Sequence, residues 1–120
     1  MTKYWLSHIH LMSPDPMKTA EYYERMFGAK RVEARDINGR LTVRLDLSGT
    51  RIFVSKASGN AAPGLGHLSF RTDNMEADAE LKVKGAKFSQ EVRSSGPAFK
   101  VAFVEAPEGL SIEVQEGTPE

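Results

Sequence analysis

Gly66-His67-Leu68-Ser69-Phe70 is the stretch that decides how this 120-residue chain is divided, because it repeats a pattern near the N-terminus. Placed over Ser7-His8-Ile9-His10-Leu11, it aligns His67 with His8 and apolar residues with apolar residues. The segment before it, residues 56–66, is rich in glycine and alanine and shows no periodicity. We therefore interpret this stretch as the start of a second copy of one module.

The first half of the chain predicts the element order β-α-β-β-β. Alternating apolar and polar residues predict four strands: Tyr4–Met12, Lys30–Asp36, Leu41–Leu47 and Arg51–Ser55. Asp15 and Pro16 fit the N-cap and first position of a helix that should run to about Phe27, where Gly28 ends it. Asn38-Gly39 predicts a type I′ hairpin turn.

The second half predicts the same order. Its four strands are His67–Arg71, Phe88–Val92, Phe99–Val104 and Leu110–Gln115. Asp73 followed by Glu76 predicts a capping box at the start of a helix that Gly85 ends. An internal repeat of about 55 residues explains these matches. We predict one α+β domain over residues 1–120, in which two tandem β-α-β-β-β modules (about 4–56 and 66–116, with a linker at 57–65) form a curved mixed sheet.

Composition excludes several classes of protein. Sixteen basic residues balance sixteen acidic ones, which gives no reason to expect binding to nucleic acid or to an anionic membrane. The chain has no cysteine, so disulfides and thiolate chemistry are excluded. No apolar run approaches the about 20 residues of a membrane span, and no signal-type segment follows Met1. We expect a cytoplasmic protein that acts on a small molecule.

Strand alternation sorts the residues of each module onto two faces. The apolar face should pack on the helices: Ile9, Leu11, Ile52, Val54, Leu68, Phe70, Ile112 and Val114. The opposite face should line a cleft: His8, His10, Thr42, Arg44, Arg51, Phe53, Ser55, His67, Ser69, Glu113 and Gln115. Polar and titratable residues gather on this second face, which is where we expect the functional site.

Three residues on the cleft face form a candidate metal site. Aligning the last strands of the two modules puts Glu113 at the position that Phe53 holds in the first module. His8, His67 and Glu113 then supply two imidazoles and one carboxylate, a set that can hold one face of a divalent metal and leave positions for substrate. The alternative is that the histidines are satisfied by hydrogen bonds and that Glu113 is a solvated charge on an edge strand.

Three of the remaining cleft residues, His10, Arg44 and Phe53, each have two possible roles. His10 is a candidate general base or substrate donor, or it hydrogen-bonds a neighbouring carbonyl. Arg44 is a candidate to bind a substrate carboxylate or phosphate, or it forms a cross-strand salt bridge. Phe53 is a candidate stacking surface for an aromatic or acyl substrate, or it fills space. Ser69 is a further candidate substrate-binding residue.

Three motifs in order resemble the vicinal oxygen chelate superfamily of glyoxalases, methylmalonyl-CoA epimerases, extradiol dioxygenases and the fosfomycin- and bleomycin-resistance proteins. They are His8-Ile9-His10-Leu11, Gly66-His67-Leu68-Ser69-Phe70, and the segment Ala102 to Gly109 running into Ile112-Glu113. The resemblance implies that His8, His67 and Glu113 are metal ligands. It also implies a homodimer in which modules of two chains can share each site, and it places Phe53 where glyoxalases and epimerases supply a fourth ligand.

From the residues and the resemblance together we predict a metal-dependent enzyme for a substrate with two neighbouring oxygens. The reaction would be a glyoxalase-like lyase or isomerase reaction, with one divalent ion (Fe, Mn, Zn, Ni or Co), with His10 moving a proton and with Glu113 in the catalytic centre. Extradiol ring cleavage by a dioxygenase is one alternative. A metal-free protein that sequesters its ligand, as bleomycin-resistance proteins do, and a fosfomycin-resistance-like protein are others.

Overall fold

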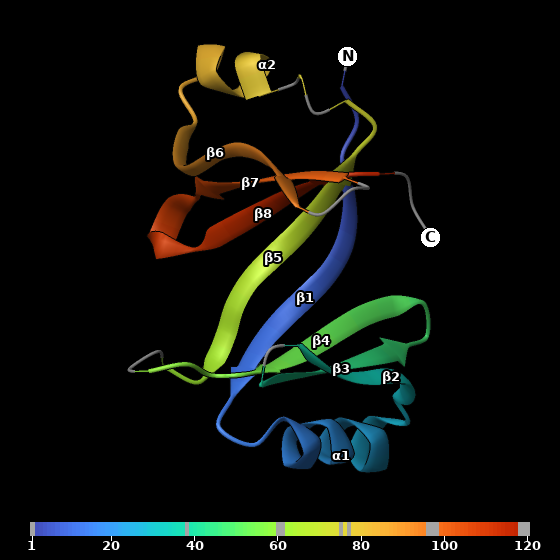
Figure 1. Cartoon of the computed structure of the whole chain (residues 1–120). Coiled ribbons are helices and arrows are strands. Elements are labelled where there is room, and N and C mark those ends of the chain that lie inside the picture. The colour runs from blue at the N-terminus through green and yellow to red at the C-terminus, as the bar shows by residue number, and fades with distance from the viewer. Residues whose placement is uncertain are drawn as a thin grey trace. The chain divides into compact units, whose positions relative to one another are not determined.

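Two β-α-β-β-β series follow one another along the chain, as the sequence predicts. The computed structural model describes residues 2–37, 39–59, 62–74, 76, 78–95 and 99–117. The elements are β1 (Trp5–Ser13), α1 (Pro16–Phe27), β2 (Lys30–Ile37), β3 (Arg40–Leu47), β4 (Thr50–Lys56), β5 (Gly64–Thr72), α2 (Asp78–Val83), β6 (Lys87–Ser95), β7 (Phe99–Glu105) and β8 (Ser111–Glu116). Figure 1 shows them coloured along the chain. Within these residues no helix is long and apolar enough to span a membrane.

The chain divides into two compact units. The α1 unit consists of residues 8–66, and the α2 unit consists of residues 1–7 and 67–120. β1 therefore contributes its residues from His8 onward to the α1 unit.

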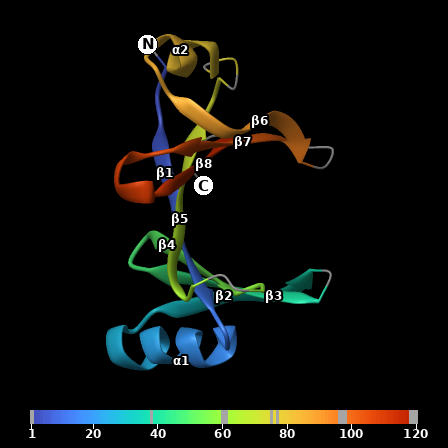
Figure 2. The same cartoon turned by 90° about the vertical axis from the view of Figure 1, so that its left-hand side faces the viewer.

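In the α1 unit the strands follow the order β2-β3-β4-β1. β2 pairs antiparallel with β3 and β3 antiparallel with β4, whereas β4 pairs parallel with β1. α1 contacts β2, β3 and β4 and covers one face of this sheet (Figure 1, Figure 2). The other face is left for the polar residues of the alternating pattern.

The apolar residues of the α1 unit pack between the sheet and α1. Ala20 of α1 and Val43, Leu45 and Val54 of the sheet are fully buried. Asp15 accepts a hydrogen bond from the backbone N–H of Lys18 at 3.2 Å, which confirms it as the N-cap. The helix thus starts where the sequence predicts, with its small residue Ala20 against the strands.

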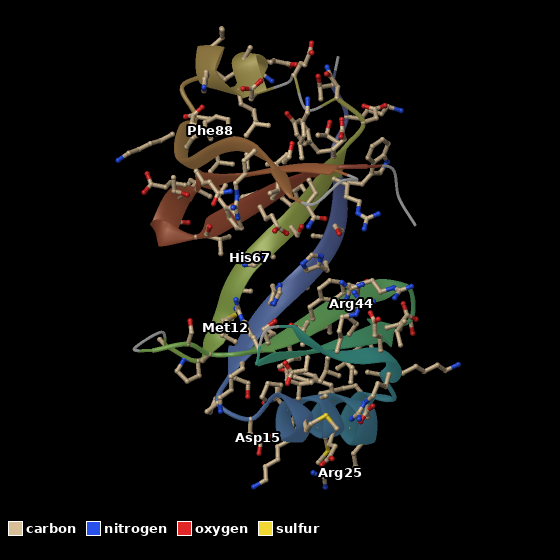
Figure 3. All side chains as sticks on the ribbon, in the orientation of Figure 1. Met12, Asp15, Arg25, Arg44, His67 and Phe88 are labelled. Carbon is tan, nitrogen blue, oxygen red and sulfur yellow. The ribbon has the colours of Figure 1, made fainter. Side chains whose placement is uncertain are left out.

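In the α2 unit the strands follow the order β5-β8-β7-β6. β5 pairs parallel with β8, and β8–β7 and β7–β6 are antiparallel. The core consists of Ala102, Val104 and Val114, with Phe88 and Ile112 partly buried against it. Figure 3 shows Phe88 on the side of β6 that faces α2. The pairing scheme is the one found in the α1 unit, with β5 and β8 in the places of β1 and β4.

The start of α2 differs from the prediction. The α-helix begins at Asp78, and Asn74 Oδ1 rather than Asp73 accepts a hydrogen bond from the Glu76 N–H, at 3.2 Å. The Asn74 N–H in turn donates to Thr72 Oγ1 at 3.3 Å. The capping box predicted at Asp73 is therefore wrong, because the neighbouring amide side chain satisfies the turn instead.

Two glycine positions bear on the sequence predictions. Gly39 has φ +79°, as an I′ turn requires, but Asn38 lies outside the described residues, so the turn type stays a prediction. At Gly66 an added Cβ would lie 2.8 Å from the Met12 Cγ, so a side chain at Gly66 would have to displace the side chain of Met12.

Candidate functional site

The predicted cleft face of the α1 unit is the sheet face opposite α1. His10 pairs with Phe53 across β1 and β4, and Phe53 pairs with Arg44 across β4 and β3, so the three side chains share one face. Figure 3 shows Arg44 on the side of the strands away from α1. Val54 and Val43, one residue along each strand, lie in the core with α1. Alternation thus assigns both faces of this unit correctly.

Phe53 lies between His8 and Arg44. The His8 ring is stacked on the Phe53 ring, with centroids 3.8 Å apart and planes at 15°. The Arg44 guanidinium lies 4.7 Å from the Phe53 ring centroid, and its Nη1 is 3.4 Å from Glu33 Oε2. For Arg44 the structure therefore favours the cross-strand salt bridge over substrate binding. Phe53 also holds the ring of His8, which is only 3% exposed.

His10 belongs to a chain of hydroxyl groups. Its Nε2 lies 2.6 Å from Ser55 Oγ, and Ser55 Oγ lies 2.7 Å from Thr42 Oγ1. Ser55 is 1% exposed, so this bond forms away from bulk water. The ring centroids of His10 and His8 are 5.4 Å apart. Such a chain fixes the orientation of an imidazole, which a residue that moves a proton requires.

In the α2 unit, Glu113 is at the centre of the cleft face. Ser69 Oγ donates to Glu113 Oε1 at 2.8 Å, and Gln115 Nε2 donates to the same oxygen at 3.0 Å. His67 Nε2 lies 3.7 Å from that oxygen. Ser69, predicted to bind substrate, therefore contacts the carboxylate instead.

His67 and Glu113 suit a divalent metal. Their side chains are 18% and 15% exposed, and the His67 ring meets the Phe103 ring edge-on, with centroids 5.6 Å apart. Imidazole nitrogen and carboxylate oxygen each bind such ions at about 2.0–2.2 Å, so the 3.7 Å between these two atoms fits two ligands of one ion. This donor set suits iron, manganese, zinc, nickel and cobalt.

Sequence reasoning placed these residues on the right face but missed the contacts between them. It did not predict the His10–Ser55–Thr42 chain or the two hydrogen bonds that Glu113 receives. The available signal was strand alternation, which put all of them on the cleft face, but their register across strands is needed to tell which ones touch.

Among the described residues, three pKa shifts occur on the helix side of the α2 unit, and one of them is that of Lys82, whose pKa is raised by its hydrogen bond to Glu91. Burial, followed by the charge of Glu80, raises the pKa of Tyr4. The hydrogen bond from Thr2 and then that from Lys84 lower the pKa of Glu80. Tyr4 lines a cavity beside Leu81 and Val114, on the apolar face, so these shifts concern the packing of α2 rather than the candidate site.

The sequence over residues 5–114 matches the profile of the Glyoxalase/Bleomycin resistance protein/Dioxygenase superfamily. The chain belongs to this superfamily, and the resemblance read from the histidine and glutamate motifs is confirmed. Among curated proteins, none is similar enough in sequence to count as a match.

Solved structures show the same fold. A hypothetical protein from Bacillus halodurans C-125 is 16% identical with a TM-score of 0.81, over 98% of this chain and 97% of its own. Methylmalonyl-CoA epimerase from Mycobacterium tuberculosis is 22% identical with a TM-score of 0.74, over 95% and 88%. A variant of the Streptomyces coelicolor epimerase, in complex with 2-nitronate-propionyl-CoA, is 20% identical with a TM-score of 0.67, over 95% and 94%.

Proposed function

We propose that this chain is a metal-dependent enzyme and that His8, His67 and Glu113 ligate one divalent ion. The observation that carries the proposal is the pair in the α2 unit, where His67 Nε2 and Glu113 Oε1 lie 3.7 Å apart on the polar face. His8 in the α1 unit and His67 in the α2 unit hold equivalent register positions. His8 directly precedes Ile9, and His67 directly precedes Leu68, the residue equivalent to Ile9. The two units that supply the ligands can belong to one chain or to two chains of a homodimer.

The ion would act as a Lewis acid towards two neighbouring oxygens of a small organic substrate. The protein's own residues supply the rest of the chemistry. His10, oriented by Ser55 at 2.6 Å, is the residue we assign to moving a proton at the carbon next to those oxygens. Phe53, stacked on His8 and with Arg44 over its ring, would hold the His8 imidazole in place rather than present a free surface to the substrate.

The reaction we favour is a proton transfer of the lyase or isomerase kind. Methylmalonyl-CoA epimerases share the fold, and an acyl thioester with a neighbouring carboxylate has the pair of oxygens that such a metal binds. The direct test is exchange of solvent deuterium into methylmalonyl-CoA and into simpler 2-oxo compounds, followed by NMR. Exchange that needs both metal and His10 supports the proposal, and metal-dependent exchange that His10→Ala leaves unchanged removes His10 from it.

The third ligand has a competitor within the α1 unit. The His10 ring lies 5.4 Å from the His8 ring, so an ion bound to His8 has His10 within reach as an alternative to Glu113. Glu113→Gln and His10→Ala separate the two arrangements. We expect Glu113→Gln to lower metal affinity by about 100-fold or more and His10→Ala to lower it by about 10-fold or less. Glu116→Gln, an exposed neighbour on the same strand, is the matched control.

Extradiol ring cleavage is the second candidate. Phe53 stands at the register position of Glu113, so the α1 unit offers no carboxylate there and the proposed ion has three protein ligands. A three-ligand site leaves more coordination positions for a bidentate catechol and oxygen. Oxygen uptake by the Fe(II)- or Mn(II)-loaded protein with catechols decides between this reaction and the isomerase.

Metal-free ligand binding, in the manner of bleomycin-resistance proteins, belongs to a different class of function. Metal analysis of the purified protein, before and after loading with each of the five ions, separates it from the enzyme classes. The absence of a bound or restorable divalent ion would end the enzyme proposal. A fosfomycin-resistance-like activity would instead keep the metal.

A further inference from the structure

We infer that Ser69 and Gln115 are positioning residues that set the Glu113 carboxylate for metal binding. The inference rests on the proposed function, since it assigns a role around one of the proposed ligands. It also replaces the substrate-binding role that the sequence suggested for Ser69.

The geometry is that of two donors on one acceptor. Ser69 on β5 is the direct cross-strand partner of Glu113 on β8, and Gln115 lies two residues further along β8 on the same face. The Ser69 hydroxyl and the Gln115 amide reach Glu113 Oε1 at 2.8 and 3.0 Å. Ser69 is 0% exposed, so its hydrogen bond is shielded from water. Hydrogen bonds to a carboxylate in such a place are charge-assisted and stronger than those between neutral groups.

These two hydrogen bonds fix the last side-chain torsion of Glu113, which would otherwise take a broad range of values. The last torsion of a glutamate side chain is broad, so the plane of a lone carboxylate is poorly defined. Two donors from different positions hold the plane in one orientation before an ion arrives. Groups around a ligand that orient it in this way change metal affinity by about 10- to 100-fold when they are removed.

The α1 unit shows that the fold does not need this arrangement. At the register positions of Ser69, Glu113 and Gln115 it carries His10, Phe53 and Ser55. The same parallel strand pair therefore forms around an aromatic ring with no carboxylate to hold. The Ser69 and Gln115 bonds belong to the chemistry of the α2 unit rather than to the pairing of β5 with β8.

The test is a Co(II) titration of the full chain followed by calorimetry and by the visible absorption of the bound ion. The variants are Ser69→Ala, Gln115→Met and the double variant, with Ser89→Ala, exposed on β6, as the control. We expect each single variant to weaken binding by about 10-fold and the double variant by about 100-fold, with a changed Co(II) spectrum. The control should match the wild type in both readouts.

The outcomes separate this inference from the proposed function. A wild type that binds no Co(II) overturns both. A wild type that binds Co(II), together with Ser69→Ala and Gln115→Met variants of unchanged affinity and spectrum, overturns the positioning role and leaves the metal site standing. Gln115 is only partly buried, so Gln115→Met decides the matter if Ser69→Ala does not fold. Weaker binding with an unchanged spectrum assigns the loss to stability and contradicts the inference.

Discussion

The two units share a strand register but not the chemistry of their polar faces. In each, a parallel pair is flanked by an antiparallel strand, and the apolar residues alternate onto the helix side. The side chains that meet on the opposite face are His10, Phe53 and Arg44 in the α1 unit and Ser69, Glu113 and Phe103 in the α2 unit. In the α1 unit the Phe53 ring lies next to the Arg44 guanidinium, whereas in the α2 unit the Phe103 ring lies next to the Glu113 carboxylate.

This difference shows which face holds the fold. Val43, Leu45 and Val54 in one unit and Ala102 and Val114 in the other are buried and apolar, so the helix-side faces are alike. The polar faces, in contrast, carry different side chains at equivalent register positions. A repeated module can therefore keep its strand pairing while only one of its copies supplies the carboxylate.

The helix sides are not equally well packed. α1 has 12 residues and buries Ala20 fully, whereas α2 has six and buries none of its described residues. Beside Leu81 of α2 and Val114 of β8 lies a cavity of about 290 Å³ with apolar walls. We expect the α1 unit to depend on core packing and the α2 helix to depend more on polar contacts.

The largest expected effect is a core truncation in the α1 unit. Leu45→Ala removes a fully buried side chain and should lower the free energy of unfolding by about 2–5 kcal/mol. Leu81→Ala, beside the cavity, should cost about 1 kcal/mol because that side chain is only half-buried. Urea unfolding of both variants measures the difference, and equal costs would contradict the packing comparison.

Replacing the ring between His8 and Arg44 is the next effect. Phe53→Leu removes a stacked aromatic pair and a cation–π contact and should cost about 1–2 kcal/mol. Phe103→Leu in the α2 unit removes one edge-on contact with His67 and should cost about half as much. A double-mutant cycle with Arg44→Met isolates the cation–π part, and a coupling energy of zero would show that the contact with the Arg44 guanidinium contributes nothing.

The helix starts give a third comparison. Asp15→Ala should cost about 1 kcal/mol, because its side chain caps the Lys18 N–H. Asp73→Ala should leave stability within about 0.5 kcal/mol of the wild type, since Asn74 accepts the hydrogen bond there. Thermal unfolding of the two variants is the measurement. A loss of stability of about 1 kcal/mol in Asp73→Ala would instead support the capping box that the sequence predicts.

The smallest expected effect concerns the hydrogen bond between Thr2 and Glu80 of α2. Thr2 Oγ1 donates to Glu80 Oε2 at 2.8 Å and, ahead of Lys84, lowers the Glu80 pKa below 4.5. A carboxyl group whose pKa is lower in the folded state than in the unfolded state stabilises the fold at pH values above its unfolded-state pKa. This contribution is lost as the pH falls through its folded-state pKa. Thr2→Val should therefore shift the urea midpoint slightly at neutral pH. The shift should vanish well below pH 4.5, and a shift that persists in acid would show that it does not come from Glu80.

Much of this molecule could be predicted from the sequence. The element order, the two faces of the sheet and the superfamily could all be predicted. The signals were the alternation in residues 41–47 and 51–55, the N-cap at Asp15 and the repeated strand that carries a histidine. The start of α2 could not be predicted, because Thr72, Asp73 and Asn74 can all cap a turn and only the backbone path selects one. The contacts of Ser55 and Gln115 also needed the strand register, which local pattern does not supply.

The central claim is that His8 and His67, at equivalent positions of the two units, are ligands of one metal. Metal content per chain of His8→Ala and His67→Ala, measured by mass spectrometry after loading and exhaustive dialysis, tests it most directly. We predict a stoichiometric divalent ion in the wild type and in Glu116→Gln, and a loss to background in both histidine variants. A His67→Ala protein that keeps the wild-type metal content would contradict the claim.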